Sequence, residues 1–391
     1  MPTISICMVN MYADFHPLEE IIVGDLDPMM EPDPFLQQVW CEVKEDLDNL
    51  ADVLKKQGVN VLRPAIIPDL SNSQVQFNSK TIAERCSFPL AIRDFYLVAG
   101  NDILLTYGSY ANRYFEDWHL YDIFMQLHQQ GAGFESMPKP PSFSHPHYAN
   151  NVSTGCDFDP TERLDKVLNG LYKTKSLNEA RSLTLRHNHR FMIYRTYLKD
   201  YLVFHSAGVA HCGDTLIRSR CGSKLGCDWF DRWAKNKGFR VEVLDSPGHI
   251  DGYFNIVRPG LIVADVKIKD AVAKWTSPLA QWEYIWVDHK MFSNGIADLW
   301  TIMETQDFSR YSSWLDEWTG MDQDFCFDVN FLALDERRII AMESSSPVVK
   351  ELERRGIEVI MIPWRHRYFI KNGIHCCTLE TKRKGTAEQY L

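Results

Sequence analysis

Hydrophobic and polar positions along the chain switch repeatedly between two periods. Short apolar runs, such as residues 4–10 and 18–24, predict strands, and the polar stretch Asp14–Pro17 between them predicts a turn. Apolar residues then recur at helical spacing and predict a helix over Gln38–Gln57, which Gly58 ends. A further strand is expected at Val59–Leu62. The opening of the chain therefore predicts one β-β-α-β unit.

The same order of elements recurs about five times, without visible sequence identity between the repeats. Further helices are expected at Arg113–Gln129, Leu225–Lys237 and Val348–Arg355, and further strands at Phe95–Ala99, Ile103–Thr106, Tyr201–Phe204, Asp214–Ile217, Arg240–Leu244, Phe254–Val257, Leu261–Val263, Phe331–Leu334, Ile339–Met342 and Val359–Ile362. A repeated unit that cannot bury its own face must pack on its neighbours. We therefore expect an α/β array of repeated units around a centre, in one domain spanning residues 1–391.

Composition narrows the class of protein. Of the 391 residues, 45% are hydrophobic and 24% are charged, which is typical of a globular enzyme. The net charge of −10 and the lack of long Lys/Arg runs argue against a nucleic-acid partner. No apolar run approaches the roughly 18 residues that a membrane span needs, so no membrane association is expected. The ten cysteines form no CxxC pair, and the opening residues resemble neither a secretory signal nor a transit peptide, so a cytoplasmic location is expected.

Two stretches carry candidate catalytic chemistry. In Lys371–Thr378 a glycine precedes His375, Cys376 and Cys377, and Ser246–Phe254 contains His249 and Asp251. A thiol, an imidazole and a carboxylate are the parts of a covalent catalyst. Cys376 is the candidate nucleophile because it lies beside the polar His375. In an extended segment the neighbouring Cys377 would point the opposite way, into the hydrophobic core of the protein. To act at neutral pH, the thiolate of Cys376 would have to be stabilised by a nearby cation or imidazolium.

The histidine and three aspartates complete this candidate site. If residues 249–251 form a strand, His249 and Asp251 face the same side, although an isolated His-x-Asp is more often an exposed polar edge. Asp214 is a candidate to orient the imidazole. Asp94, alone, reads as a turn or cap residue. The three aspartates together could hold a planar cation, because a guanidinium suits paired carboxylates.

Metal and phosphate motifs are weak. The spacing of His211, Cys212, Cys221 and Cys227 matches no common zinc pattern, so no metal is expected. The run Gly222–Gly226 lacks the Gly-Lys-Ser/Thr ending of a phosphate-binding loop. No organic cofactor is expected either.

Seven motifs, taken in chain order, resemble the arginine:glycine amidinotransferase family, which includes inosamine-phosphate and cyanotoxin-pathway amidinotransferases. The resemblance spans nearly the whole chain. The motifs are Leu18–Gly24, Asp94 with Val98–Ile103, Arg113–Glu116, Pro138–Pro140, Cys212–Asp214, His249–Asp251 with Phe254 and Pro259–Gly260, and Gly373-x-His375-Cys376-x-Thr378 followed by Lys382–Thr386.

This resemblance implies a five-bladed α/β propeller, the pentein fold, without a metal or organic cofactor. It implies that Cys376 is the nucleophile and forms an amidino-cysteine, that His249 is the acid/base and that Asp214 is its partner. Asp94 and Asp251 would bind the donor, L-arginine or a similar guanidine, and an amine would be the acceptor. A homodimer is also implied.

The chain departs from the family pattern at three places. Ile268, flanked by Lys267 and Lys269, stands where the family has an arginine for the donor carboxylate. Gln323-Asp324 replaces a serine pair, and we expect these residues to bind substrate. Asp324 could favour an acceptor with an extra amine, such as lysine or a polyamine. The segment 205–208 reads His-Ser-Ala-Gly where the family is acidic.

Two other functions remain open from the sequence. A hydrolase of the deiminase type would use water as the acceptor, and Gly-Ile-His-Cys-x-Thr also occurs in agmatine-deiminase-like enzymes. The opening strand and the Lys382–Thr386 tail favour the transferase. A non-catalytic binding protein is the third alternative, against which the presence of Cys376, His249 and Asp214 argues.

Overall fold

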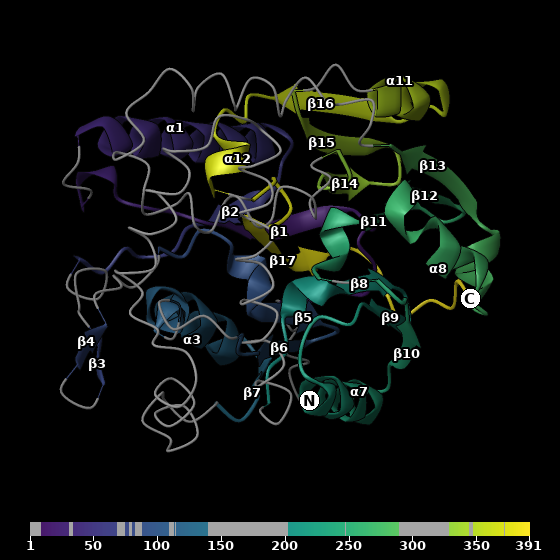
Figure 1. Ribbon diagram of the computed structural model, residues 1–391, viewed down its shortest axis with the longest axis horizontal. Coiled ribbons are helices and arrows are strands. Elements are labelled where there is room, and N and C mark those ends of the chain that lie inside the picture. Colours follow the sequence, from purple (N-terminus) through teal and green to yellow (C-terminus); the bar gives the residue numbers. More distant parts are fainter. Residues whose placement is uncertain are drawn as a thin grey trace, which may run out of the picture.

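The computed structural model confirms the repeated unit. It describes residues 9–30, 34–68, 75–77, 80–82, 88–108, 113, 115–139, 202–246, 248–288, 328–343, 347–370 and 372–391. These residues form five three-stranded sheets and one separate hairpin, β3–β4 (Val75–Phe77, Lys80–Ile82). The arrangement is an α/β fold (Figure 1).

The five three-stranded sheets share one design. In each, the first two strands are antiparallel, and the middle and third strands are parallel. Their strands, in sheet order, are β17 (Thr378–Arg383), β1 (Leu18–Val23) and β2 (Asn60–Leu62); β5 (Tyr96–Ala99), β6 (Asp102–Leu105) and β7 (Gly133–Ser136); β8 (Val209–Cys212), β9 (Thr215–Arg218) and β10 (Arg240–Val243); β11 (Phe254–Arg258), β12 (Leu261–Asp265) and β13 (Glu283–Val287); and β14 (Leu332–Asp335), β15 (Arg338–Met342) and β16 (Glu358–Ile362).

A helical crossover joins the middle strand of each sheet to the third, because parallel neighbours cannot be joined by a tight turn. The crossovers contain α1 (Pro34–Lys56), α3 (Tyr121–Gln129), α7 (Lys224–Asn236), α8 (Lys269–Ala273) and α11 (Pro347–Arg354). A last short helix, α12 (Arg367–Ile370), precedes the turn that carries Cys376. In the part of the chain that the structure describes, no helix is long and apolar enough to cross a bilayer.

Five hydrophobic clusters hold the sheets together, and each cluster is shared by consecutive sheets. Neighbouring residues of one strand therefore serve different clusters: Ile103 packs toward β1 and β17, and Leu104 packs toward β8 and β9. Strands buried on both faces read as continuous apolar runs, as this sequence does. The cluster that contains Ile340 and Ile21 joins the last sheet to the first. In Figure 1 the sheets follow one another around the molecule in chain order.

The first sheet pairs a strand from near the beginning of the described chain with a strand from near its end. Its strand β17 comes from the C-terminal region and pairs antiparallel with β1, so that Thr378 lies opposite Val23. Most of the strand predicted at residues 4–10 lies outside the described residues, which begin at residue 9. Asn10 makes only an isolated bridge to Lys382. This pairing places the His-Cys turn beside elements that lie more than 250 residues earlier in the sequence.

One predicted helix is confirmed only in part, and one predicted strand is wrong. The helix expected from Arg113 begins only at Tyr121, after a 3-10 helix, η4 (Glu116–Leu120). Here Arg113 turns inward and donates hydrogen bonds to Glu116 and Asp94. The strand expected at Tyr201–Phe204 is absent from the described residues 202–204, where Phe204 makes only an isolated bridge, and the strand β8 follows instead.

A buried ion cluster joins β17 to its neighbours. Glu380 of β17 is buried and forms ion pairs with Arg93 and Arg383. Arg383 also donates to the backbone oxygens of His16 (2.5 Å) and Ala333 (2.7 Å). Burial would raise the pKa of Glu380, but the two guanidinium groups hold it well below its usual range.

We predict that Glu380→Gln lowers the free energy of unfolding by about 3–5 kcal/mol, because it leaves two buried arginines without their counter-ion. The lowered pKa of Glu380 makes this stabilisation complete above its ordinary value of 4.5, and it is lost as the pH falls toward the lowered folded value. Urea unfolding should therefore show a difference in the free energy of unfolding between the parent protein and Glu380→Gln that is largest at neutral pH and becomes smaller in acid. Glu358→Gln, on the exposed side of β16, is the matched control. A gap of constant size from neutral to acidic pH would contradict this assignment.

Candidate active site

A polar side chain precedes the first strand of four sheets, and a thiol precedes that of the fifth. Three of these segments are 3-10 helices or their caps: η2 (Ile92–Asp94) before β5, η6 (Ser206–Gly208) before β8 and η7 (Ile250–Gly252) before β11. Equivalent ends of equivalent strands meet in such an array, so the five segments converge. Their side chains are Asp94, His205, Asp251, Asn330 and Cys376.

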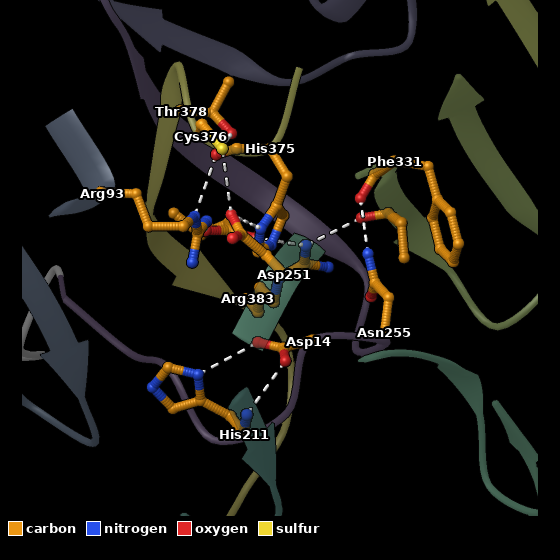
Figure 2. Close-up of polar contacts among 12 residues, drawn as sticks. Asp14, Arg93, His211, Asp251, Asn255, Phe331, His375, Cys376, Thr378 and Arg383 are labelled. Carbon is orange, nitrogen blue, oxygen red and sulfur yellow. Dashed lines mark hydrogen bonds and ion pairs between the residues drawn. The ribbon is translucent and has the colours of Figure 1, made fainter. Parts of the chain in front are cut away.

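Cys376 lies in a turn, buried, between a carboxylate and an amide. Its Sγ is 3.3 Å from Asp251 Oδ2, to which the thiol donates, and 3.1 Å from Asn330 Nδ2. Asn330 also accepts from the backbone N–H groups of His375 (2.9 Å) and Cys376 (3.3 Å) through Oδ1. Figure 2 shows Cys376, His375 and Asp251 gathered together beside Arg93.

The structure explains the glycine of this motif. A Cβ atom on Gly373 would lie 2.2 Å from Asn330 Oδ1, so only glycine allows this approach. The prediction of an extended segment at Cys376 is wrong, because residues 374–377 form a turn. Cys377 nevertheless lies in the hydrophobic core, as expected.

His249 lies between Asp94 and His205. The predicted strand at 249–251 is wrong: His249 caps η7, with Asp251 inside that 3-10 helix. The ring atom Nδ1 is 3.3 Å from Asp94 Oδ1, and Nε2 is 3.1 Å from His205 Nδ1. Asp251, buried, instead accepts from His375 Nδ1 at 3.2 Å.

Asp214 is the one sequence-predicted catalytic residue that the structure does not bring to this site. Its carboxylate pairs with Arg240 (2.7 Å) and accepts from Thr215 (2.8 Å) in the turn between β8 and β9. That turn follows the end of β8, whereas His205 precedes its beginning. Asp94 therefore takes the place beside His249 that the sequence assigned to Asp214.

The charges of the site favour a neutral thiol beside an imidazolium. Burial raises the pKa of the Cys376 thiol well above its ordinary value, and the negative charges of Asp251 and Asp94 raise it further. Burial alone would lower the pKa of His249, but Asp94, Cys221 and Asp251 raise it to about 10. A cation placed against Cys376 would stabilise its thiolate and lower the pKa of the thiol.

Asp251 has an acceptor for such a cation. Its buried Oδ1 has no hydrogen-bond partner among the described residues. A guanidinium offers planar N–H donors that match a carboxylate. Arg113 and Arg93, the nearby protein cations, are already paired with Asp94 and Glu380 respectively.

Sequence reasoning missed several residues of this site. Asn330 carried no signal in the sequence, and His205 was noticed only as a departure from a family pattern. Cys221 lies near His249, and the ligand atoms of His205, Cys221 and His249 all fall within 4.8 Å of one another. The predicted substrate residues Gln323 and Asp324 lie outside the described residues. Ile268, in η8 (Val266–Ile268), is buried in a hydrophobic cluster, while Lys267 and Lys269 are exposed.

Curated proteins that resemble the chain over its whole length are amidinotransferases. The mitochondrial glycine amidinotransferase of Gallus gallus is 23% identical over 422 residues, covering 98% of this chain and 85% of that protein. The L-arginine:L-lysine amidinotransferase of Pseudomonas savastanoi pv. phaseolicola is 22% identical over 409 residues, covering 97% and 96%. No protein-family model matches the chain.

Solved structures show the same fold. SxtG, an amidinotransferase from Microseira wollei in the saxitoxin biosynthetic pathway, has a TM-score of 0.70 at 21% identity, covering 98% of this chain and 100% of that one. The inosamine-phosphate amidinotransferase of Streptomyces griseus has a TM-score of 0.64 at 21% identity, covering 98% and 99%. A dimethylarginine dimethylaminohydrolase is more distant, with a TM-score of 0.52 at 11% identity, covering 93% and 99%. The resemblance to amidinotransferases is therefore confirmed, and the α/β fold is of the pentein type.

We predict that alkylation of Cys376 by iodoacetamide keeps becoming faster with pH beyond the plateau of an ordinary thiol, whose pKa is about 8.5, because burial and two carboxylates raise the pKa of this thiol. Asp251→Asn removes a negative charge and should move this profile to lower pH. The measurement is the alkylation rate of the Cys376 peptide by mass spectrometry. Asp245→Asn, an exposed aspartate paired with Arg220, is the control. A rate that reaches its plateau within about one pH unit above 8.5, as for an ordinary thiol, would refute the raised pKa.

Proposed function

We propose that this protein is an amidinotransferase that moves the amidino group of L-arginine, or of a similar guanidine donor, to an acceptor amine through an amidino-cysteine at Cys376. One observation carries the proposal. The buried thiol of Cys376 donates to Asp251, whose other carboxylate oxygen has no hydrogen-bond partner among the described residues. A guanidinium would pair with that oxygen and bring the positive charge that the thiolate needs.

The first half-reaction forms a bond between Cys376 Sγ and the guanidinium carbon. The bond from that carbon to the side-chain nitrogen of the donor then breaks, and the electron pair leaves with the amine. His249, an imidazolium in the free protein, donates a proton to this amine and recovers one proton from the thiol. The net products are the S-amidino-cysteine, which keeps the positive charge, and the free amine.

The second half-reaction is the reverse with a different amine. The acceptor nitrogen attacks the amidino carbon, the carbon–sulfur bond breaks and His249 passes the acceptor's proton to the departing sulfur. Asp94 would hold the imidazole through Nδ1 and stabilise its charged form, and it would also bind the donor. Asn330 would orient Cys376 through its hydrogen bonds to the turn.

The acceptor amine is the second substrate of the proposed reaction. The curated relatives include a glycine amidinotransferase and an L-arginine:L-lysine amidinotransferase. We propose that Gln323 and Asp324 take part in binding it, with Asp324 favouring an acceptor that carries an extra amine. Asp324→Ser should then weaken selection for such an acceptor.

The wider setting of the site is also a proposal. We infer that the five sheets close into a five-bladed α/β propeller within a single domain of 391 residues. The cluster that joins the last sheet to the first supports this closure. A cytosolic location and a homodimer stay predictions.

We predict that incubation with L-arginine and no acceptor adds one amidino group to the protein and releases ornithine. Intact mass after an acid quench measures the adduct. Cys376→Ala should show no adduct, whereas Cys41→Ala, a thiol in α1, should behave as the unmodified protein. Citrulline and ammonia formed on turnover would instead show a hydrolase. No adduct and no product would show that arginine is not the donor.

We also predict that Asp94→Asn and Asp214→Asn differ. Asp94→Asn should lower kcat by about 100-fold or more, because it removes the charge that holds His249 protonated and oriented. Asp214→Asn should change kcat by less than about threefold, because its contacts are with Arg240 and Thr215. The measurement is steady-state kinetics on variants that retain the melting temperature of the parent. The opposite ranking would restore Asp214 as the partner of His249.

A further inference from the structure

His205, Cys221 and His249 form a compact cluster at the edge of the proposed catalytic site. His205 Nδ1 and His249 Nε2 face each other at 3.1 Å, and the Cys221 sulfur and one ring nitrogen of each histidine all lie within 4.8 Å of one another. In a tetrahedral zinc site, bond lengths of about 2.0–2.3 Å place neighbouring ligand atoms about 3.3–3.6 Å apart. Only small movements would bring these three atoms to that geometry.

The surroundings of His249 are those of a metal ligand. A histidine that binds a metal through one ring nitrogen usually donates the other N–H to a carboxylate, which fixes the orientation of the ring. Here Asp94 Oδ1 lies at an ion-pair distance of 3.3 Å from His249 Nδ1, on the ring nitrogen that does not face His205, and this oxygen makes no hydrogen bond among the described residues. Asp94 is itself held by Arg113. Asp94 thus contacts one candidate ligand without belonging to the set of three.

The backbone holds the cluster in place. His205 N donates to the carbonyl oxygen of Cys221 at 3.2 Å, which ties two of the ligand-bearing residues together. Ser219 Oγ donates to the carbonyl oxygen of Gly248 at 2.6 Å, next to His249. His205 and Cys221 are buried, and His249 is largely so. The ligands therefore need little ordering before a metal binds.

We propose that His205, Cys221 and His249 form a binding site for a thiophilic divalent cation of the zinc type. Two imidazole nitrogens and one thiolate are ligands that zinc favours, and three protein ligands leave a fourth position for water. Residue spacing in the sequence does not reveal this set of ligands, because the three residues come from separate segments of the chain. Of the four residues whose spacing matched no common zinc pattern in the sequence, only Cys221 belongs to this set.

The site would control the proposed reaction, and this consequence rests on the proposed function. The metal would displace the proton from Nε2 of His249 and occupy that nitrogen, while Asp94 holds Nδ1. No ring nitrogen would then remain to exchange a proton with the donor or acceptor amine. The metal-bound protein would therefore be inactive, and removal of the metal would restore activity.

Binding is tested without turnover. After treatment with a chelator, the full-length protein is titrated with Zn²⁺ against a chromophoric chelator, and with Co²⁺ while the ultraviolet thiolate-to-cobalt charge-transfer band is recorded. We expect one bound equivalent with this band. Cys221→Ser should abolish the band, and His205→Ala should weaken zinc binding by at least about tenfold. Cys41→Ser is the control for an unrelated thiol.

Cys376→Ala separates this site from the proposed nucleophile. It should lose amidino transfer and keep both zinc binding and the cobalt band. A band that disappears in Cys376→Ala but persists in Cys221→Ser would overturn the proposal, as would the absence of a bound equivalent. Because binding is read without turnover, a metal-free protein that fails to transfer amidino groups would count against the proposed function alone.

Inhibition supplies the second readout. Zn²⁺ should inhibit amidino transfer reversibly, and a chelator should restore the rate. In Cys221→Ser the zinc concentration for half inhibition, measured against that variant's own metal-free rate, should rise by at least about tenfold. Equal inhibition of both proteins would place the inhibitory metal elsewhere and overturn the control that we propose.

Discussion

The ion cluster around Glu380 is the interaction on which the site depends. A carboxylate at full burial is tolerated only because Arg93 and Arg383 compensate its charge. Arg93 immediately precedes Asp94, and its Nε donates to the backbone oxygen of His375 at 2.9 Å. Arg383 reaches His16 and Ala333. One buried charge thus connects the segments that carry Asp94 and Cys376 with both ends of the described chain.

The repeated fold makes such convergence possible. Each sheet begins with a strand that is preceded by a short irregular segment, and these segments lie together because the sheets share one design. Function is then a matter of which side chain each segment supplies. Two acids, three histidines, one amide and one thiol meet in this way, although each sheet supplies at most two of them.

The histidine pair distinguishes this chain from a simple thiol–imidazole–carboxylate site. Imidazole nitrogens 3.1 Å apart beside a cysteine offer ligands to a metal, whereas a carboxylate in the place of His205 would only hold the proton of His249. The same ring can therefore serve proton transfer or metal binding, but not both at once. The chemistry of the site and its proposed control share one residue.

Local patterns in the sequence predict the repeated β-β-α-β order, the buried strands, the candidate nucleophile Cys376 and the pair His249 and Asp251, because periodicity and short motifs are properties of neighbouring residues. The folded arrangement, by contrast, places Asp94 and not Asp214 beside His249. It also brought in His205, Cys221 and Asn330. Asp214 and His205 lie at opposite ends of the four-residue strand β8, so the direction of one strand decides which of them enters the site. That direction follows from packing between sheets, which no local pattern records.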